Sequence, residues 1–248
     1  MKKFYVVLVV LILIAWRCTY SDKSENKYPV VIDMDEAIMN KIDYKLSAIF
    51  DSISYIPIES KDGLLVSGPR RIKISDNYII FFDGTTSELL LFDGSGRFIR
   101  KIAQRGKGPG EYNFVQDLAI DEHNNIIYVL CNDNRKIFKY NFQGSFLGNI
   151  LLTKYVDAMD ISSSNTILLH FPNWAGNLEY SWLLLNTNGD TINLFKNNIF
   201  YIPQKRNYWE SEAIYYRYRN QLHVKDKCDT LFVIAEDNTM TPMPPKLA

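Results

Sequence analysis

The sequence lacks an excess of charge of either sign, because 28 lysine and arginine residues balance 28 aspartate and glutamate residues. Proteins that bind nucleic acid normally carry a basic excess that neutralises phosphates, so the balance argues against nucleic acid as a partner. Proline and glycine are not abundant, at 9 and 12 of 248 residues, whereas tyrosine and phenylalanine number 16 and 14. This composition is typical of a folded chain rather than a disordered one.

Histidine and cysteine are scarce, with three of each. His123, His170 and His223 are not spaced as metal ligands, and His223 with Cys228 has no companion ligand. We therefore expect no metal and no other cofactor. Cys131 lies in an apolar run and Cys228 lies beside one, which favours free buried thiols, although an exported protein can also pair its cysteines. The sequence leaves that pairing open.

Signatures of catalysis are also missing. The sequence contains neither the Gly-x-Ser-x-Gly elbow of serine hydrolases nor the Gly-Lys-Ser/Thr of a nucleotide-binding loop. Paired carboxylates cannot be placed without a structure. We expect no catalytic residues, which favours a protein that is not an enzyme without deciding the question.

A long hydrophobic run is present only at the N-terminus. Lys2 and Lys3 precede residues 4–16, which are uncharged and almost wholly apolar. A helix that spans a bilayer needs about 20 apolar residues, so this run is too short and is typical of a signal-peptide core. Residues 1–17 are predicted to be a signal peptide, and the protein is predicted to be exported.

Cys18 follows the apolar run after one residue, Arg17, and precedes a polar stretch. This arrangement resembles a bacterial lipoprotein signal, in which the cysteine becomes the lipidated first residue. The resemblance implies a lipid on Cys18, anchorage to a membrane of the cell envelope (outer membrane or periplasm), and a tether over residues 18–50. Arg17 departs from the small residue that normally precedes such a cysteine. An ordinary secreted protein and an uncleaved anchor are the alternatives.

Repeated units follow from about residue 51, with short apolar runs separated by turn signals and no helix-length apolar stripe. The alternation in 53–59 predicts a first strand. Two units then close on Gly96 and Gly144, 48 residues apart, and a third closes on Gly189, 45 residues further on. A fourth, weaker unit begins near residue 214. The period and the three or four strands per unit are typical of propeller blades. The sequence predicts an all-β fold of β-propeller repeats over residues 51–242, with a tail over 243–248.

A glycine-rich segment separates the first two units. Its glycines alternate, but strands are expected on both sides and no helix follows, which excludes a nucleotide-binding loop. We interpret it as a structural blade joint, in which glycine permits positive φ and proline stiffens the turn. The residues of this joint are Gly106, Gly108, Pro109, Gly110, Glu111 and Tyr112.

The residues around this joint resemble a known group. The runs 92–102, 106–112 and 118–121 resemble NHL-type repeats and, more closely, the six-bladed β-propeller lipoproteins of Gram-negative bacteria, which residues 55–59 also match. The resemblance implies an extracytoplasmic propeller and no common activity. Six blades need roughly 276 residues, whereas about 200 follow Ile53. We expect a shortened relative with about four blade units, in an open or partial ring.

Residues of the third unit are candidates for contact with a ligand, because aromatic rings can stack on sugars, although most such rings simply pack in a core. The candidates are His170, Trp174, Tyr208 and Trp209. The expected function is an extracytoplasmic binding or scaffold lipoprotein whose ligand is an unknown protein or glycan. A metal-dependent propeller lyase or lactonase and a truncated, non-functional remnant are the alternatives. An enzyme of that kind needs at least three ligands that converge on the axis.

Overall fold

The computed structural model describes residues 38–39, 43, 45–48, 50–60, 63–162, 165–197, 213–218, 221–225 and 230–243. The chain divides into two compact units, Met1–Ser54 and Tyr55–Ala248. In the first unit, η2 (Leu46–Ala48) is a short 3-10 helix. The predicted signal peptide, Cys18 and most of the tether lie outside the described residues. No helix within the described ranges is long and apolar enough to cross a membrane.

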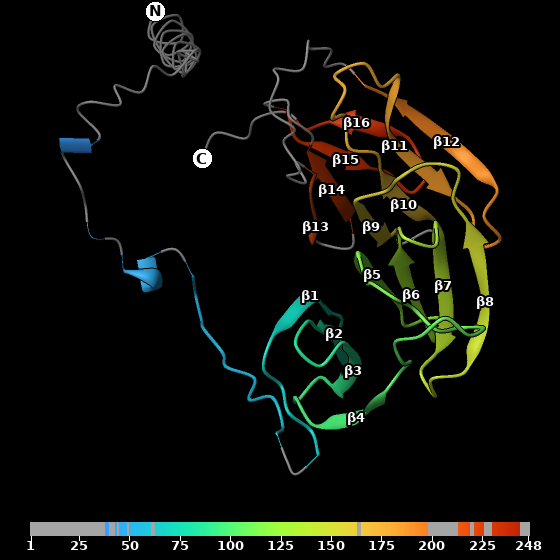
Figure 1. The fold of residues 1–248 in the computed structure, drawn as a ribbon. Helices are drawn as coiled ribbons and strands as arrows, with labels where there is room; N and C mark the ends of the chain where they lie inside the picture. The colour runs from blue at the N-terminus through green and yellow to red at the C-terminus, as the bar shows by residue number, and fades with distance from the viewer. Residues whose placement is uncertain are drawn as a thin grey trace, which may run out of the picture. The chain divides into compact units, whose positions relative to one another are not determined.

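The second unit consists of four antiparallel sheets of four consecutive strands each, arranged in a ring as the blades of a β-propeller (Figure 1). The first blade contains β1 (Pro69–Ile74), β2 (Tyr78–Asp83), β3 (Glu88–Asp93) and β4 (Phe98–Lys101). The second blade contains β5 (Asp117–Asp121), β6 (Ile126–Cys131), β7 (Lys136–Asn141) and β8 (Phe146–Leu151).

The third blade contains β9 (Ala158–Ile161), β10 (Ile167–His170), β11 (Tyr180–Leu185) and β12 (Thr191–Lys196). The fourth blade contains β13 (Ile214–Tyr218), β14 (Gln221–Lys225), β15 (Phe232–Ile234) and β16 (Met240–Pro242). The prediction of an all-β propeller with four units is confirmed. The described part of the chain contains four blades, whereas the lipoprotein propellers that the sequence resembles have six blades.

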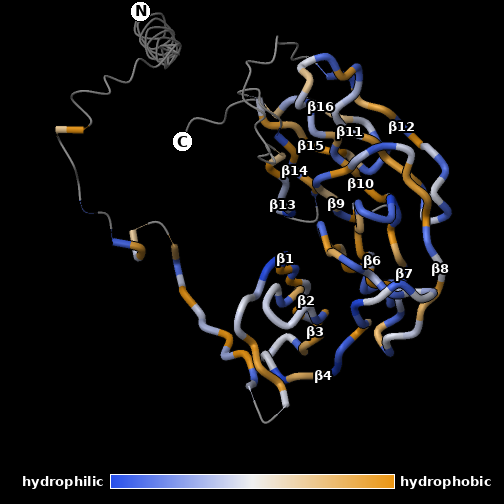
Figure 2. The backbone as a smooth tube through the Cα atoms, viewed as in Figure 1, coloured by the Kyte–Doolittle hydropathy of each residue, from blue (hydrophilic) through white to orange (hydrophobic). Residues whose placement is uncertain are grey.

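Apolar strands are covered on both faces because the blades stack on one another. Five of the six residues of β2 and of β6 are buried, which would not be possible in a sheet with one face exposed to solvent. Figure 2 shows the apolar segments in the strands and the polar ones in many of the turns. One apolar cluster joins the first blade to the second, another the second to the third, and another the third to the fourth. Among the described residues no such cluster joins the fourth blade to the first.

The turn between the last two strands of a blade has the same form in three blades. Gly96, Gly144 and Gly189 have φ of +85°, +83° and +97°, and each donates its N–H to the carbonyl three residues before it. Glycine adopts this left-handed conformation without steric cost. The fourth blade has Asn238 at this place, with φ of 62°, and asparagine is one of the few other residues that tolerate it. We call these the closing turns.

A buried carboxylate fixes the chain where it enters the first blade. Asp83 is fully buried and accepts hydrogen bonds from four backbone N–H groups, those of Thr86, Gly68, Ser67 and Thr85, at 2.8–3.0 Å. Burial alone would raise the pKa of Asp83, but the four hydrogen bonds hold that pKa below its ordinary value. The carboxylate therefore stays charged and ties residues 67–68 to the turn after β2.

The strand predicted over 53–59 is not formed. Pro57 has no N–H to donate to a ladder, and the described residues offer this segment no neighbouring strand. The leading segment (Tyr55–Glu59) contacts the first blade through Glu59 instead. The Glu59 N–H donates to the carbonyl of Gly96 at 2.8 Å, and its carboxylate accepts the N–H of Phe98 at 2.7 Å.

Candidate functional site

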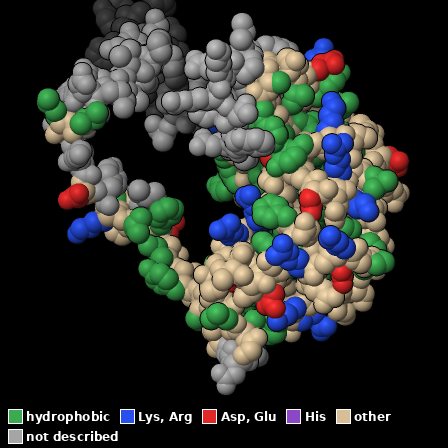
Figure 3. Space-filling model, in the orientation of Figure 1, with side chains coloured by type: hydrophobic (Ala, Val, Ile, Leu, Met, Phe, Trp, Pro, Cys, Tyr) green, Lys and Arg blue, Asp and Glu red, His purple; other side chains and the backbone are tan. Residues whose placement is uncertain are grey.

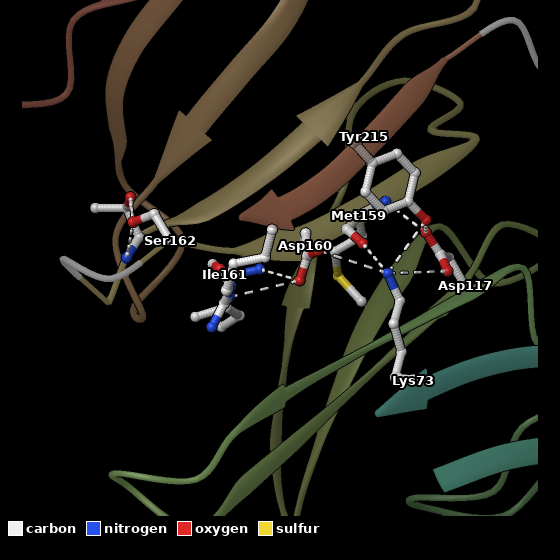
Figure 4. A network of polar contacts seen from close by, with 9 residues as sticks. Lys73, Asp117, Met159, Asp160, Ile161, Ser162 and Tyr215 are labelled. Atoms are coloured by element: carbon white, nitrogen blue, oxygen red, sulfur yellow. Dashed lines mark hydrogen bonds and ion pairs between the residues drawn. The ribbon is translucent and has the colours of Figure 1, made fainter. Parts of the chain in front are cut away.

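A network of polar side chains connects the first strands of all four blades (Figure 4). These strands, β1, β5, β9 and β13, lie innermost in the ring (Figure 1). We call the set the central network, and its members are Lys73, Asp117, Asp160, Tyr215 and Arg217.

Lys73 lies at the middle of the central network. Its ammonium is 3.9 Å from Asp117 Oδ1 and 3.7 Å from Asp160 Oδ2, and it donates to the Met159 carbonyl and to the Tyr215 hydroxyl at 3.3 Å each. It also lies 4.3 Å from the centre of the Tyr215 ring, within the range of a cation–π contact. One side chain of the first blade thus contacts the other three blades.

Asp117 is the most enclosed carboxylate of the network, with 5% of its side chain exposed. It accepts hydrogen bonds from the Tyr215 hydroxyl at 2.5 Å, the Met159 N–H at 2.7 Å and the Leu118 N–H at 2.9 Å. Burial raises the pKa of Asp117, and the positive charge of Lys73 offsets part of this rise. Burial and then the charge of Asp117 raise the pKa of Tyr215, which keeps the phenol protonated as a donor.

Asp160 connects the two cations of the network. Its side chain lies near Lys73 and 3.9 Å from Arg217 Nη2, and Arg217 also donates to the Ile161 carbonyl. Two cations therefore face two carboxylates, and the network compensates its charge internally. Such an arrangement holds the innermost strands of the four blades together.

A cleft of about 810 Å³ opens at the central network, four of whose members line it together with other residues of the four innermost strands and of the turns after β1, β5 and β9. Its walls include exposed apolar side chains, because Ile72 is 51% exposed, Ile74 68% and Tyr216 44%. The polar residues of its lining include Asp76, Glu122, His123 and Asn165. On the face shown in Figure 3, acidic and basic side chains are interspersed, without a large field of one sign.

Groups that could hold a metal ion do not occur in the described ranges, since no three histidine, cysteine, aspartate or glutamate side chains there lie close enough together. His123 lines the cleft by itself, and His223 is buried with its ring stacked on Tyr216 at 5.0 Å. Cys131 is buried, and burial raises the pKa of its thiol. Cys228 lies outside the described residues, so the pairing of these two cysteines stays open.

The candidate ligand contacts of the third unit are not brought together with the cleft. His170 in β10 is 1% exposed, with Nδ1 2.6 Å from Asp157 Oδ1 and its ring 4.5 Å from that of Trp182. Trp174 packs 4.8 Å from the ring of Tyr155 in a separate cavity of about 250 Å³. Tyr208 and Trp209 lie outside the described residues. Contact of these four residues with a ligand stays a prediction.

The glycine-rich segment lies between β4 and β5, where the chain passes from the first blade to the second. Glu111 occupies its concave side, accepting the side-chain N–H of Gln104 and the backbone N–H of Gly108 at 2.7 Å each. These bonds lower the pKa of Glu111. Tyr112 is fully buried and donates its hydroxyl hydrogen to the Ser87 carbonyl at 3.0 Å. The carboxylate of Glu111 thus occupies the concave side of the glycine-rich segment, where the backbone N–H groups of such a loop would otherwise bind an anion.

The central network was missed in the sequence because its members are single charges inside apolar strands. A signal was nevertheless present. When the units are aligned, each first strand carries a charged residue next to at least one apolar or aromatic one: Lys73, Asp117, Asp160 and Arg217. A charge in a strand that must be covered on both faces needs a partner, and the common axis of a propeller is where four first strands can supply one to each other.

The stacked sheets and the network on their axis define the class of this chain, a β-propeller protein. The chain belongs to the family of the domain of unknown function DUF4934, whose family model matches residues 29–243. None of the curated proteins matches it.

Solved structures with the same fold include a protein of Bacteroides fragilis NCTC 9343 that is described as exported, with 20% identity, a TM-score of 0.61, and coverage of 77% of this chain and 54% of that one. A DUF4221 family member of Bacteroides vulgatus ATCC 8482 has 14% identity, a TM-score of 0.47 and coverage of 72% and 57%. Virginiamycin B lyase from Staphylococcus aureus has 12% identity, a TM-score of 0.44 and coverage of 73% and 56%. The chain spans about half the length of these structures.

Proposed function

We propose that this chain is an exported binding or scaffold protein of the cell envelope, anchored by a lipid on Cys18, that binds a protein partner at the cleft lined by the four innermost strands. The signal-like residues 1–17 support export, and the description of the similar Bacteroides fragilis protein is in keeping with it. Cys18 at the end of the apolar run supports the anchor.

The observation that carries the binding role is the contrast between the two kinds of side chain in the cleft. The charges of the central network are already compensated by one another, whereas Ile72, Ile74 and Tyr216 leave about half or more of their surface exposed. A cleft of this kind gains free energy by covering apolar surface rather than by supplying free charges. Polar side chains also line the cleft, so the preference for a protein partner over a glycan is drawn from the exposed Ile72, Ile74 and Tyr216 alone.

The alternative of a metal-dependent lyase or lactonase has less support in the described residues. Such an enzyme needs several convergent ligands, whereas the innermost strands bring Asp117 and Asp160 together with Lys73 between them. The ammonium occupies the position from which two carboxylates would otherwise hold a cation.

Site-specific crosslinking in the source cells tests the binding role. A photo-crosslinking residue in place of Ile74 should give one discrete adduct with another protein, and Tyr216→Arg in the same chain should abolish it. The same residue in place of Leu151, which is 73% exposed on β8, serves as the matched control and should give none. Equal crosslinking from both positions, or none from Ile74, would contradict the proposal.

Mass spectrometry of the mature chain tests the anchor separately. We expect a first residue of Cys18 that carries lipid. An unmodified chain that begins elsewhere would end the proposed anchorage and leave the binding role untouched.

A further inference from the structure

A cavity of about 250 Å³ lies at the end of the propeller opposite the cleft. Successive strands of a blade run in opposite directions, so the turns after the innermost strands gather at one end and the segments between blades at the other. The cleft is lined by turns of the first kind. The cavity is lined by the segment between β8 and β9 and by the turn after β10, which lie at the other end. We call it the aromatic cavity, and its lining residues are Lys154, Tyr155, Phe171, Pro172, Trp174 and Leu178.

Three aromatic rings form much of the wall of this cavity. The rings of Tyr155 and Trp174 are 4.8 Å apart and inclined to each other by 49°, and Phe171 lines the cavity with them. Tyr155 keeps 40% of its surface exposed although it packs on Trp174. Drug-sized ligands occupy pockets of about 300–1,000 Å³, so the smaller aromatic cavity suits a single ring that stacks on the aromatic side chains.

The aromatic cavity carries a positive charge. Lys154 is exposed, and its Nζ lies 5.7 Å from the centre of the Phe171 ring, within the range of a cation–π contact. No carboxylate of the described residues forms an ion pair with Lys154. A cationic ligand would be repelled by this ammonium and would compete with it for the rings, whereas a carboxylate would be attracted. The charge therefore favours an anionic ligand.

Arg71 adds a second positive charge near Tyr155. It is an exposed residue of β1 with a left-handed φ of 51°, at the point where the pairing of β1 with β2 shifts register. Burial and then the charge of Asp157 raise the pKa of Tyr155, whereas the charge of Arg71 lowers it. Asp157 itself is 5% exposed, and its Oδ1 lies 2.6 Å from His170 Nδ1. This carboxylate is therefore directed to the His170 ring rather than to the aromatic cavity.

The hydroxyl of Tyr155 gives the cavity a polar edge. It donates to Gln116 Oε1 at 3.3 Å, and a phenol oxygen can accept a hydrogen bond while it donates one. A sugar ring supplies a C–H face for the aromatic side chains and hydroxyl groups for this edge, whereas an aromatic acid supplies only a face. Among anionic rings, the edge therefore favours a sugar that carries a carboxylate.

We propose that the aromatic cavity binds one acidic sugar ring, a hexuronate of a glycan, with the sugar face on Tyr155 and Trp174 and the carboxylate at Lys154. The proposal goes beyond the function proposed for the cleft, which is assigned a protein partner at the opposite end of the propeller. It does not rest on that function, because the two sites share no lining residue.

Two disaccharides that differ by one carboxyl group supply the probe. Cellobiose is neutral, and cellobiuronic acid carries a glucuronate in place of one of its two glucose rings. Each is titrated into the full chain by isothermal titration calorimetry. We expect the acid to bind about fivefold more tightly than cellobiose, because exposed ion pairs contribute modestly. This preference should shrink as the salt concentration rises, because salt screens exposed charges.

Variants separate the charge from the stacking surface. Lys154→Gln should reduce the preference for the acid to about twofold, since Arg71 remains, and should leave the affinity for cellobiose unchanged. Lys196→Gln, at an exposed position on β12, is the matched control and should change neither affinity. Trp174→Ala should weaken the binding of both disaccharides about tenfold. Tyr216→Arg, in the cleft, should change neither.

Equal affinity for the two disaccharides, no measurable binding of either, or an unchanged preference in Lys154→Gln would overturn the acidic-sugar site. Benzoate that binds as tightly as cellobiuronic acid would overturn the sugar as its ligand. Lys154 is exposed, so its variant keeps the test decisive even where Trp174→Ala fails to fold. A discrete adduct from Ile74 in cells without any binding of the disaccharides would support the function of the cleft and overturn only this second site.

Discussion

Replacing Lys73 by methionine removes a positive charge from the centre of the propeller and keeps the length of the side chain. Asp117 then stays buried, 5% exposed, without the cation at 3.9 Å. Removing one partner of a buried ion pair costs about 3–5 kcal/mol. Lys73 itself keeps 17% of its side chain exposed, so we expect a loss near the lower end, about 3 kcal/mol, in the free energy of unfolding.

The loss should depend on pH in a definite direction. Burial raises the pKa of Asp117, and without Lys73 that pKa rises further. A carboxyl group with a higher pKa in the folded than in the unfolded chain stabilises the fold below the unfolded pKa, and this contribution is lost as the pH rises through the folded pKa. The variant should therefore differ little from the wild type near pH 4 and most near pH 8.

Urea unfolding followed by tryptophan fluorescence at these two pH values measures the effect. The double variant Lys73→Met/Asp117→Asn serves as the control, because it removes the carboxylate that the single variant leaves unpaired, and it should regain most of the stability at the higher pH. A loss under about 1 kcal/mol, typical of exposed pairs, or a loss of equal size at both pH values would refute this account of the central network.

Three smaller changes test other parts of the fold by the same unfolding assay. Asp83→Asn should cost about 2 kcal/mol near neutral pH, and the difference from the wild type should shrink in acid, because a carboxyl with a lowered pKa loses its contribution as the pH falls through the folded pKa. Gly144→Ala should destabilise more than Gly63→Ala, since both have positive φ but only Gly144 has a carbonyl, 2.9 Å away, against the new methyl. Tyr112→Phe should lower the free energy of unfolding by about 1 kcal/mol, the usual value of one hydrogen bond. An unchanged free energy of unfolding would show that the Tyr112 hydroxyl does not stabilise the blade joint.

The fold was predictable because its signals are local. Runs such as 78–82 are apolar on both faces of a strand, and the spacing of Gly96, Gly144 and Gly189 marks the repeat. The strand predicted over 53–59 was wrong because alternation reports only that a segment can pair. Whether it does pair depends on a neighbouring strand, which the pattern of one segment does not contain.

The central network was not predictable to the same degree. Lys73 and Tyr215 are 142 residues apart, and their contact follows from how four blades converge on an axis rather than from any motif. His170 shows the opposite case. It was a candidate for contact with a ligand, but its register with Trp182 places it inside a blade, where its Nδ1 lies 2.6 Å from Asp157 Oδ1. Residue type alone did not distinguish these environments.

Stacked blades that contact only their neighbours form a linear array, in which a blade at one end can unfold while the blades that do not contact it stay folded. Lys73 changes this behaviour, because a side chain of the first blade contacts residues of the third and fourth. Unfolding of the first blade would leave Asp117 of the second blade and Asp160 of the third without their shared cation. Opening one end therefore also destabilises blades further along the array. The cooperativity of the second unit therefore depends to a large extent on a single ammonium group at its axis.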